Sequence, residues 1–262
     1  MKITDLEVRA GGHRLAARIL GDIVPGRPTL VFLHGGLDCI ALWRGLPEAV
    51  VAATGLPALI YERWGHGGSD PLILPKVPEH RLNEAGPVLG EVLASCGIGA
   101  AILVGHSYGG CLALLGAALH PERVQAAVAI APQLVMHEAA RAGLARAIAA
   151  WESGKLRASL EKYHGANTET LFQGWIAETE DAGMVARYRA LLERIARPVL
   201  VLVGDRDEYG YRPNLELIEA AVAPRWRTIE VVPDWRHHPH WHDLDGVAAR
   251  IVEGLRTLPG AC

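Results

Sequence analysis

Residues 105–109 read Gly-His-Ser-Tyr-Gly and stand between an apolar run, residues 100–104, and a run of small apolar residues, 111–119. This order predicts a buried strand that turns abruptly into a helix at Ser107. In such a turn the serine backbone is strained so that Oγ projects from the sheet, and the flanking glycines let strand and helix approach closely. The stretch therefore predicts an exposed serine nucleophile. The alternative is a glycine-rich turn with an incidental serine.

Strand-like and helix-like runs alternate on both sides of this turn. Two alternating segments joined by Gly-Gly, residues 3–10 and 13–20, predict a β-hairpin. Further strands are expected at 29–33, 58–61, 124–130, 199–203 and 228–232, and helices at 42–53, 79–96, 215–222 and 247–255. The alternation predicts an α/β fold: a mostly parallel central sheet with helices on both faces.

The alternation stops between residues 133 and 196, where no strand-like run occurs. Helical spacing there predicts four helices, at 137–153, 156–163, 168–178 and 184–195. The sequence thus indicates a helical block inserted between two strands of the sheet.

A serine hydroxyl is a weak nucleophile unless a base takes its proton and a third group orients the base. Candidate partners follow two later strands, with acids after residues 199–203 and histidines after 228–232. The acids are Asp205, Asp207 and Glu208, and the histidines are His237, His238, His240 and His242. Together with Ser107 they give the chain order serine, acid, histidine, each placed just after a strand.

These pieces resemble the α/β-hydrolase superfamily, in its serine branch with a helical cap, across nearly the whole chain. The matching stretches are residues 34–36, 62–69, 105–110, 204–207 and 233–237. The resemblance implies a hydrolase core formed by residues 1–132 and 197–262. It also implies that the helical block, residues 133–196, is a cap that covers the pocket and selects the substrate.

The resemblance implies a catalytic triad of Ser107, Asp207 and His237. The family places the acid three residues after the glycine that ends the strand, and Asp207 follows Gly204 at that distance. It usually has glycine before the histidine, where this sequence has Arg236. Other residues remain open for both roles: Asp205 or Glu208 as the acid, and His238, His240 or His242 as the base.

An oxyanion needs two hydrogen-bond donors. The backbone N–H of Tyr108, at the start of the helix after the serine, is one candidate. The family pattern takes the other from Gly36, with Leu37 as the alternative. His34 is expected to brace this loop by hydrogen bonding. Glu62 and Arg63 are expected to support the architecture as a local ion pair.

The sequence predicts neither a metal nor an organic cofactor. The cluster of His237, His238, His240 and His242 suggests a metal site, but its spacing is interrupted by proline and lacks a matched cysteine or carboxylate pattern. The cysteines show no C-x-x-C spacing and are expected to be free thiols: Cys39, Cys96, Cys111 and Cys262.

The composition is that of a globular enzyme, with 262 residues, 50% hydrophobic and 21% charged. A net charge of −3 gives no electrostatic footprint for nucleic acid, and no basic run suggests a membrane surface. No long apolar segment follows Met1, so we expect neither a signal peptide nor a membrane span, and a cytoplasmic location. The expected partner is a small-molecule substrate, and the sequence allows a homodimer.

The resemblance implies a serine hydrolase that cleaves a small ester-like substrate through an acyl-enzyme, as a carboxylic ester hydrolase does. The alternatives on the same triad are a C–C bond hydrolase, a lactonase and a cofactor-free perhydrolase. A small-ligand receptor without turnover is an alternative of another class. Three aromatic residues of the predicted cap are candidates for the substrate pocket or for packing: Trp151, Phe172 and Trp175.

Overall fold

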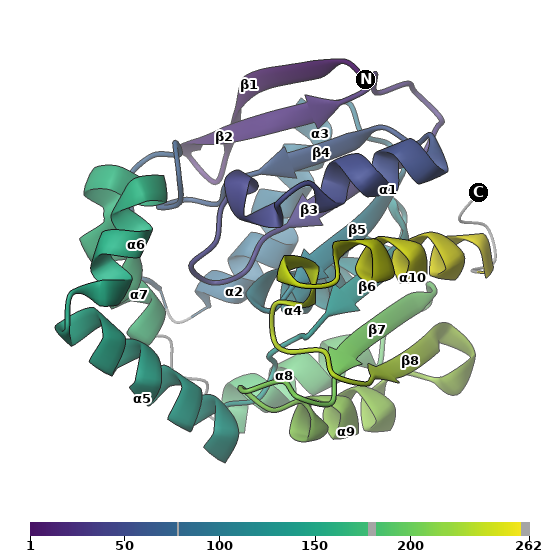
Figure 1. The fold of residues 1–262 in the computed structure, drawn as a ribbon. Helices are drawn as coiled ribbons and strands as arrows, with labels where there is room; N and C mark the ends of the chain where they lie inside the picture. Colours follow the sequence, from purple (N-terminus) through teal and green to yellow (C-terminus); the bar gives the residue numbers. More distant parts are fainter. Residues whose placement is uncertain (78, 178–181, 258–262) are drawn as a thin grey trace.

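A computed structural model of the chain describes residues 1–77, 79–177 and 182–257. Eight strands in these residues form one sheet, in the order β1-β2-β4-β3-β5-β6-β7-β8. β2 pairs antiparallel with β1 and β4, and the other neighbouring pairs are parallel. The strands are β1 Ile3–Ala10, β2 His13–Leu20, β3 Thr29–Leu33, β4 Ala58–Tyr61, β5 Ala101–His106, β6 Val124–Ile130, β7 Val199–Gly204 and β8 Arg227–Val232. The predicted α/β fold is confirmed (Figure 1).

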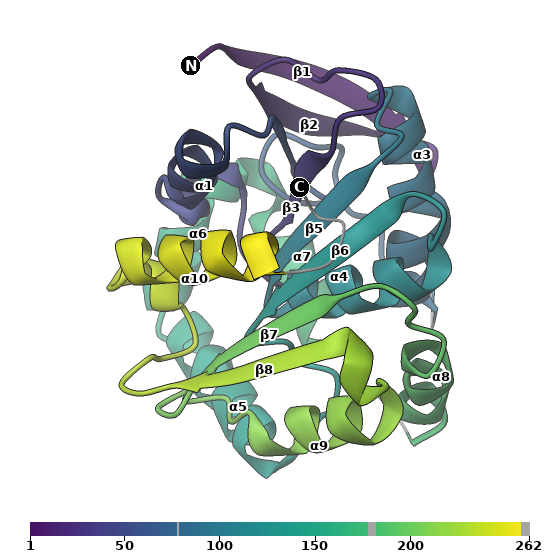
Figure 2. The same ribbon diagram turned by 90° about the vertical axis from the view of Figure 1, so that its right-hand side faces the viewer.

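Helices cover both faces of the sheet (Figure 2). One face carries α1 Leu46–Thr54 and α10 Leu244–Thr257, and the other carries α3 Leu89–Ser95, α4 Tyr108–Leu119, α8 Ala182–Leu192 and α9 Arg212–Ala221. Along β3, Leu30 and Phe32 pack under the first group, while Val31 and Leu33 pack under the second. Successive side chains of a strand point to opposite faces, so a strand covered on both sides must be apolar throughout.

The helix expected at residues 42–53 is divided. A 3-10 turn, η1 Ile40–Trp43, precedes α1. Between them Arg44 and Gly45 adopt positive φ angles of 52° and 95°. A right-handed helix cannot continue through left-handed residues, so the chain changes direction there.

The helix expected at residues 79–96 contains a wider turn. α2 His80–Asn83 leads into a π-helical segment, η2 Glu84–Val88, which continues into α3. Pro87 lies inside this segment. Proline has no backbone N–H and crowds the preceding turn, which a regular α-helix does not accommodate.

The helical block between β6 and β7 comprises α5 Glu138–Glu152, α6 Lys155–His164, η3 Gly165–Asn167, α7 Thr168–Ile176 and α8. In Figure 1, α5, α6 and α7 stand together beside the sheet. They have a small core of their own around Trp151, Leu160 and Phe172. α8 instead contributes Tyr188 and Leu192 to the main core, so it belongs to the layer over the sheet. Glu178, expected to end the third helix, lies outside the described residues.

The remaining short helices are η4 Pro224–Trp226 and η5 Pro239–Trp241. Cys39 and Cys111 are buried and Cys96 is half-buried, and each is a thiol outside any disulfide of the described residues, as expected, while Cys262 lies outside those residues. Across residues 1–77, 79–177 and 182–257, none of the helices has both the length and the apolar character to span a bilayer.

Candidate active site

Ser107 is the single residue between β5 and α4, and its backbone is strained, with φ 54° and ψ −113°. Its N–H donates to the carbonyl of Ile130 on the neighbouring strand, at 2.8 Å. A Cβ on Gly105 would lie 1.9 Å from the Gly109 carbonyl oxygen, and one on Gly109 would lie 1.8 Å from the Leu33 carbonyl oxygen. No larger residue fits at either glycine, so the close approach that presents the serine depends on both.

Three side chains from separate loops form a hydrogen-bonded chain at this turn. His237 Nε2 lies 2.9 Å from Ser107 Oγ, and His237 Nδ1 lies 2.9 and 3.0 Å from the carboxylate oxygens of Asp207. A carboxylate only accepts hydrogen bonds, so Nδ1 carries the proton and Nε2 is free to accept the serine proton. Both His237 and Asp207 are buried. The structure thus brings together the serine, histidine and acid singled out in the sequence.

The alternative acids have other partners. Asp205 Oδ1 accepts the N–H of Asp234 at 2.7 Å, which ties the ends of β7 and β8 together. Glu208 Oε2 accepts the backbone N–H of His237 at 3.1 Å. Glu208 therefore holds the histidine loop, a role that its position after the strand did not suggest.

The other histidines of this loop also have different neighbours. His240 is buried against Trp43, with ring centroids 5.4 Å apart, and His242 is exposed. His238 stacks on Trp241 and directs Nε2 toward Asp38 Oδ2, at 3.9 Å.

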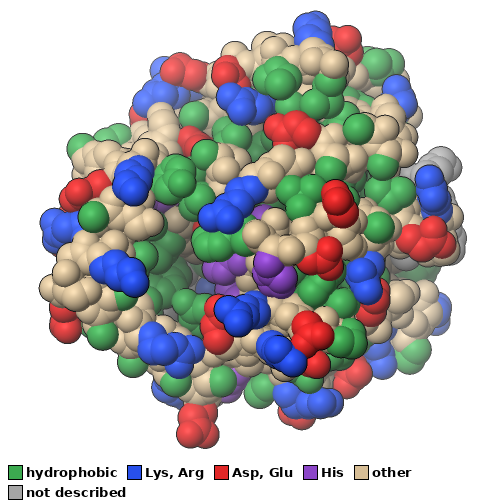
Figure 3. All heavy atoms as spheres, in the orientation of Figure 1, with side chains coloured by type: hydrophobic (Ala, Val, Ile, Leu, Met, Phe, Trp, Pro, Cys, Tyr) green, Lys and Arg blue, Asp and Glu red, His purple; other side chains and the backbone are tan. Residues whose placement is uncertain are grey.

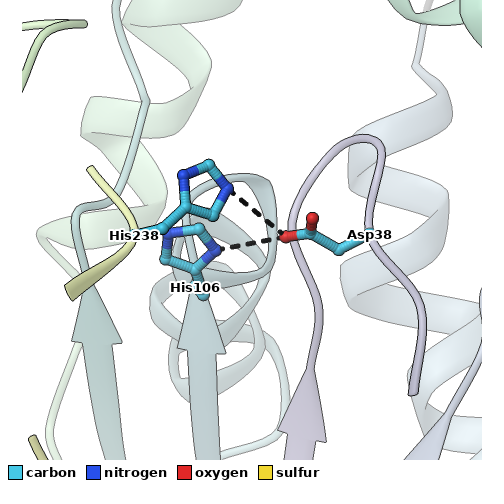
Figure 4. A group of neighbouring side chains, drawn as sticks. All are labelled: Asp38, His106 and His238. Carbon is cyan, nitrogen blue, oxygen red and sulfur yellow. Dashed lines mark ion pairs between the residues drawn. The ribbon is translucent and has the colours of Figure 1, made fainter. Parts of the chain in front are cut away.

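A second group of titratable side chains lies beside this triad (Figure 4). Asp38, His106 and His238 converge so that one possible ligand atom from each lies within 4.8 Å of the others. The four-histidine metal set considered from the sequence does not form. His237 is hydrogen-bonded to Asp207 and Ser107, and His242 faces solvent. Asp38 and His106 were missed because Asp38, in the loop after β3, and His106, at the end of β5, are far from His238 in sequence.

The loop after β3 contains both candidates for the second oxyanion donor. Gly36 and Leu37 line the same cavity as Ser107 and Tyr108. A Cβ on Gly36 would lie 2.5 Å from Trp175 Nε1, so only glycine leaves room beneath that indole.

Arg63 and His34 brace this loop from below. Arg63 donates from its guanidinium to the carbonyls of His34 and Gly35 and from its backbone N–H to His34 Nε2. Because Nε2 accepts, His34 Nδ1 carries the proton and donates to the Gly35 carbonyl at 2.9 Å. The brace expected of His34 is present.

The prediction of a local ion pair between Glu62 and Arg63 is wrong. Arg63 Nε instead lies 3.5 Å from buried Glu84, which the π-helical segment η2 supplies. Glu62 accepts the backbone N–H groups of Ile40 and Gly68, so it holds two loops together. Two adjacent residues in an extended segment point to opposite sides, which separates their partners.

His164, at the end of α6, joins the helical block to these loops. Its Nδ1 accepts the N–H of Gly67 at 2.9 Å, and its Nε2 donates to the Leu37 carbonyl at 3.0 Å. Nothing in the sequence marked this contact, because it joins residues far apart along the chain.

A cavity of about 510 Å³ opens over Ser107 and His237. Its walls are largely apolar and come from α5 and α6, among them Leu144, Ala147, Leu156 and Leu160. Figure 3 shows histidine side chains beside a hollow with hydrophobic side chains around it. The cavity is therefore shaped for a small molecule with an apolar part.

Of the three aromatic residues proposed for the pocket, Trp175 lines this cavity. Trp151 and Phe172 stack on each other, with ring centroids 4.0 Å apart, in the core of the helical block. They hold α5 against α7, which is the packing role that the sequence left open.

We predict that the protein loses stability as the pH falls below about 6.5. Burial, followed by the charge of Arg63, keeps the pKa of His34 and of His66 well below the usual value, and burial lowers the pKa of His164. The unfolded chain takes up these protons near pH 6.5 while the folded chain does not, so stability is complete above that pH and declines below it. His34 and His66 together cost about 2 to 3 kcal/mol between pH 7 and 5.5, and His164 adds to this loss.

Urea unfolding followed by tryptophan fluorescence at several pH values measures this loss. His242→Gln, a change at an exposed ring, is the control and should leave the pH dependence unchanged. An unfolding free energy that stays flat between pH 7 and 5.5 would show that these imidazoles are not held neutral.

Comparisons with known proteins agree with this architecture. The family model for the alpha/beta hydrolase fold matches residues 28–191. The mouse sn-1-specific diacylglycerol lipase ABHD11 is 32% identical over 103 residues, which cover 39% of this chain. The match spans about a third of that relative, 32% of its length.

Solved structures match over almost the whole chain. The enol-lactonase from Burkholderia xenovorans LB400 has a TM-score of 0.75 at 19% identity, over 96% of this chain and 100% of its own. The 2-hydroxy-6-oxo-6-phenylhexa-2,4-dienoate hydrolase of Rhodococcus sp. strain RHA1 has a TM-score of 0.75 at 20% identity, over 98% and 99%. The carboxylesterase CesB from Bacillus subtilis has a TM-score of 0.69 at 20% identity, over 97% and 92%. At these identities the likeness is one of fold.

Proposed function

The chain belongs to the α/β-hydrolase fold family, and we propose that it is a serine hydrolase acting on a small ester-like substrate. The observation that carries the proposal is the unbroken contact from Ser107 Oγ through His237 to Asp207, at 2.9 Å on either side of the imidazole. A hydroxyl, an oriented base and a buried carboxylate in this order form a unit for nucleophilic attack on a carbonyl.

In the proposed reaction Ser107 Oγ bonds to the substrate carbonyl carbon while its proton passes to His237 Nε2. Asp207 keeps the imidazole in the required tautomer and stabilises the imidazolium that forms. The N–H groups of Gly36 and Tyr108 bind the negative oxygen of the tetrahedral intermediate. The intermediate collapses, and the alcohol leaves with the proton from His237. Water then attacks the acyl-enzyme by the same steps and releases the acid.

The cavity supports a substrate with an apolar acyl or alcohol group. A volume of about 510 Å³ lies within the range of small-molecule sites, about 300 to 1,000 Å³. α5, α6 and α7 form one side of this cavity, so we propose that these three helices act as the cap and select the substrate. α8 packs in the main core and is not part of that cap.

Labelling with a serine-directed fluorophosphonate, followed by mass spectrometry, tests the proposal. We expect one adduct, located on Ser107, and turnover of chromogenic acyl esters that the reagent abolishes. A folded protein that gives neither an adduct nor ester turnover would contradict the serine mechanism. It would favour a ligand-binding role for the same cavity.

We predict that Ala147→Trp changes the preference for acyl length. Ala147 lies on α5 and lines the cavity, so an indole there occupies part of the space for a long acyl chain. Octanoate esters should lose at least about tenfold in kcat/KM, while acetate esters stay within about threefold. Parallel kinetics on the two esters measure the effect.

Ala145→Trp is the matched control, because Ala145 is exposed on the same helix. The control should keep both activities. Equal losses on acetate and octanoate in Ala147→Trp would mean that the acyl group does not occupy the space beside α5.

A further inference from the structure

Asp38 lies in an unusual environment for a carboxylate. It is 8% exposed, and in the part of the chain that the structure describes its ion-pair contacts are to histidine nitrogens alone, from His106 and His238. A buried carboxylate without a positive partner is costly, so this group requires a counter-charge. The counter-charge is either a proton on one of the rings or a cation held between them.

The hydrogen bonding of His106 decides which of its nitrogens faces Asp38. Its Nε2 lies 2.7 Å from the backbone oxygen of His237, and a carbonyl oxygen only accepts, so Nε2 carries the proton. In the neutral ring Nδ1 then offers a lone pair. His106 is 1% exposed, and Nδ1 has no hydrogen-bond partner among the described residues while facing Asp38 Oδ2. A histidine that binds a metal through one nitrogen usually donates from the other to a backbone carbonyl or a carboxylate.

The distances favour a cation over a proton. A charged hydrogen bond between imidazolium and carboxylate has a length of about 2.7 to 2.9 Å. His106 Nδ1 and Asp38 Oδ2 are 3.4 Å apart, and His238 Nε2 and the same oxygen are 3.9 Å apart. Two atoms bound to one zinc ion at about 2.1 Å, at a tetrahedral angle, are about 3.4 Å apart. The first pair has this separation, and the second pair is 0.5 Å wider.

We propose that Asp38 Oδ2, His106 Nδ1 and His238 Nε2 bind one Zn²⁺ ion. Figure 4 shows that the three side chains converge. Two imidazoles and one carboxylate are ligands that zinc accepts, and three protein ligands leave one coordination position open. Asp38 and His238 line the cavity over Ser107, so the open position is reached from the cavity and takes water or an oxygen of a bound molecule.

The proposed ion is separate from the proton transfers of the triad. It shares no ligand with Ser107, His237 and Asp207. It does connect two loops and the end of a strand, because Asp38 follows β3, His106 ends β5 and His238 follows β8. We therefore expect bound zinc to stabilise the loop arrangement around the triad as well as to bind at the cavity wall.

Calorimetric titration of the full chain tests the site. The protein is stripped with EDTA and titrated with Zn²⁺ at pH 7.5, and then loaded with Co²⁺, whose visible absorption reports a tetrahedral site. We expect one ion per chain and an intense cobalt spectrum. Asp38→Asn and His238→Gln should each weaken zinc binding at least about 100-fold, because each removes a direct ligand. His242→Gln, in the same loop but exposed, should bind as the parent does.

Three outcomes would overturn the site: no saturable binding by the folded parent, equal binding by parent and ligand variants, or a doubly protonated His106 ring at pH 8 in nitrogen NMR. The last would show that a proton provides the counter-charge. If Asp38→Asn fails to fold by circular dichroism, His238→Gln decides, because that side chain is partly exposed. Fluorophosphonate labelling of the stripped protein tests the serine mechanism separately, because the proposed ion shares no ligand with Ser107, His237 and Asp207.

Discussion

Replacing Ser107 with alanine is expected to reduce ester hydrolysis by about 10⁴-fold or more and to abolish the fluorophosphonate adduct. The structure gives the reason. The hydroxyl of Ser107 lies 2.9 Å from His237 Nε2, and the turn between β5 and α4 directs this side chain toward the imidazole. Without Oγ no acyl-enzyme forms, while the cavity and the loop N–H groups remain. The readouts are kcat/KM on an acyl ester and the intact mass after labelling.

Ser159→Ala is the control for this experiment. Ser159 also lines the cavity but lies on α6, away from the imidazole. Its replacement should leave both rate and labelling within about twofold of the parent. If Ser107→Ala retained the rate while Ser159→Ala lost it, the nucleophile would have to be sought in the cap.

The second large effect is expected of Asp207→Asn, with a loss of about 10³ to 10⁴-fold in kcat. The carboxylate accepts the Nδ1 proton of His237, which leaves Nε2 able to take the proton of Ser107. An amide of the same shape can donate to Nδ1 and so stabilise the opposite tautomer, in which Nε2 is already protonated. The substitution should therefore reduce kcat much more than substrate binding, as steady-state kinetics over a range of ester concentrations will show.

Asp205→Asn makes the same chemical change two residues earlier. Asp205 caps the N–H of Asp234 and does not contact the imidazole, so its variant should keep its rate within a fewfold. The two variants thus distinguish Asp207, the acid that the geometry favours, from Asp205, which the sequence left as an alternative. The reverse order of effects would exclude Asp207 as the orienting group.

Much of the fold could be predicted because the sheet is buried on both faces. β3 and β7 read as almost continuous apolar runs, and glycine or proline residues mark where they end. The divided helix at α1 was not predicted, since Arg44 has no preference for the left-handed conformation that it adopts. Packing around Leu46 and Trp43 imposes that turn, and packing is not visible in local sequence.

The serine, acid and histidine of the proposed triad could be predicted because each follows a strand within a short, recognisable motif. The residues that support these loops could not be predicted. Glu84 reaches Arg63 from a π-helical turn, and His164 reaches Leu37 across 127 positions. Such contacts leave no periodic signal in the chain. The same limit applies to Trp175, which could be separated from the packing aromatics only when the helices were placed over the sheet.

The contact proposed to activate Ser107 spans 130 positions, and the histidine follows β8, which lies at the end of the sheet beside β7. Contacts between residues so far apart close late in folding, after local turns and helices have formed. During synthesis the serine emerges long before its base. If Ser107 is the nucleophile as proposed, the nascent chain is therefore unreactive until β8 pairs with β7 and brings His237 to the serine. Acylation of Ser107 would thus report the completion of folding as well as the presence of the site.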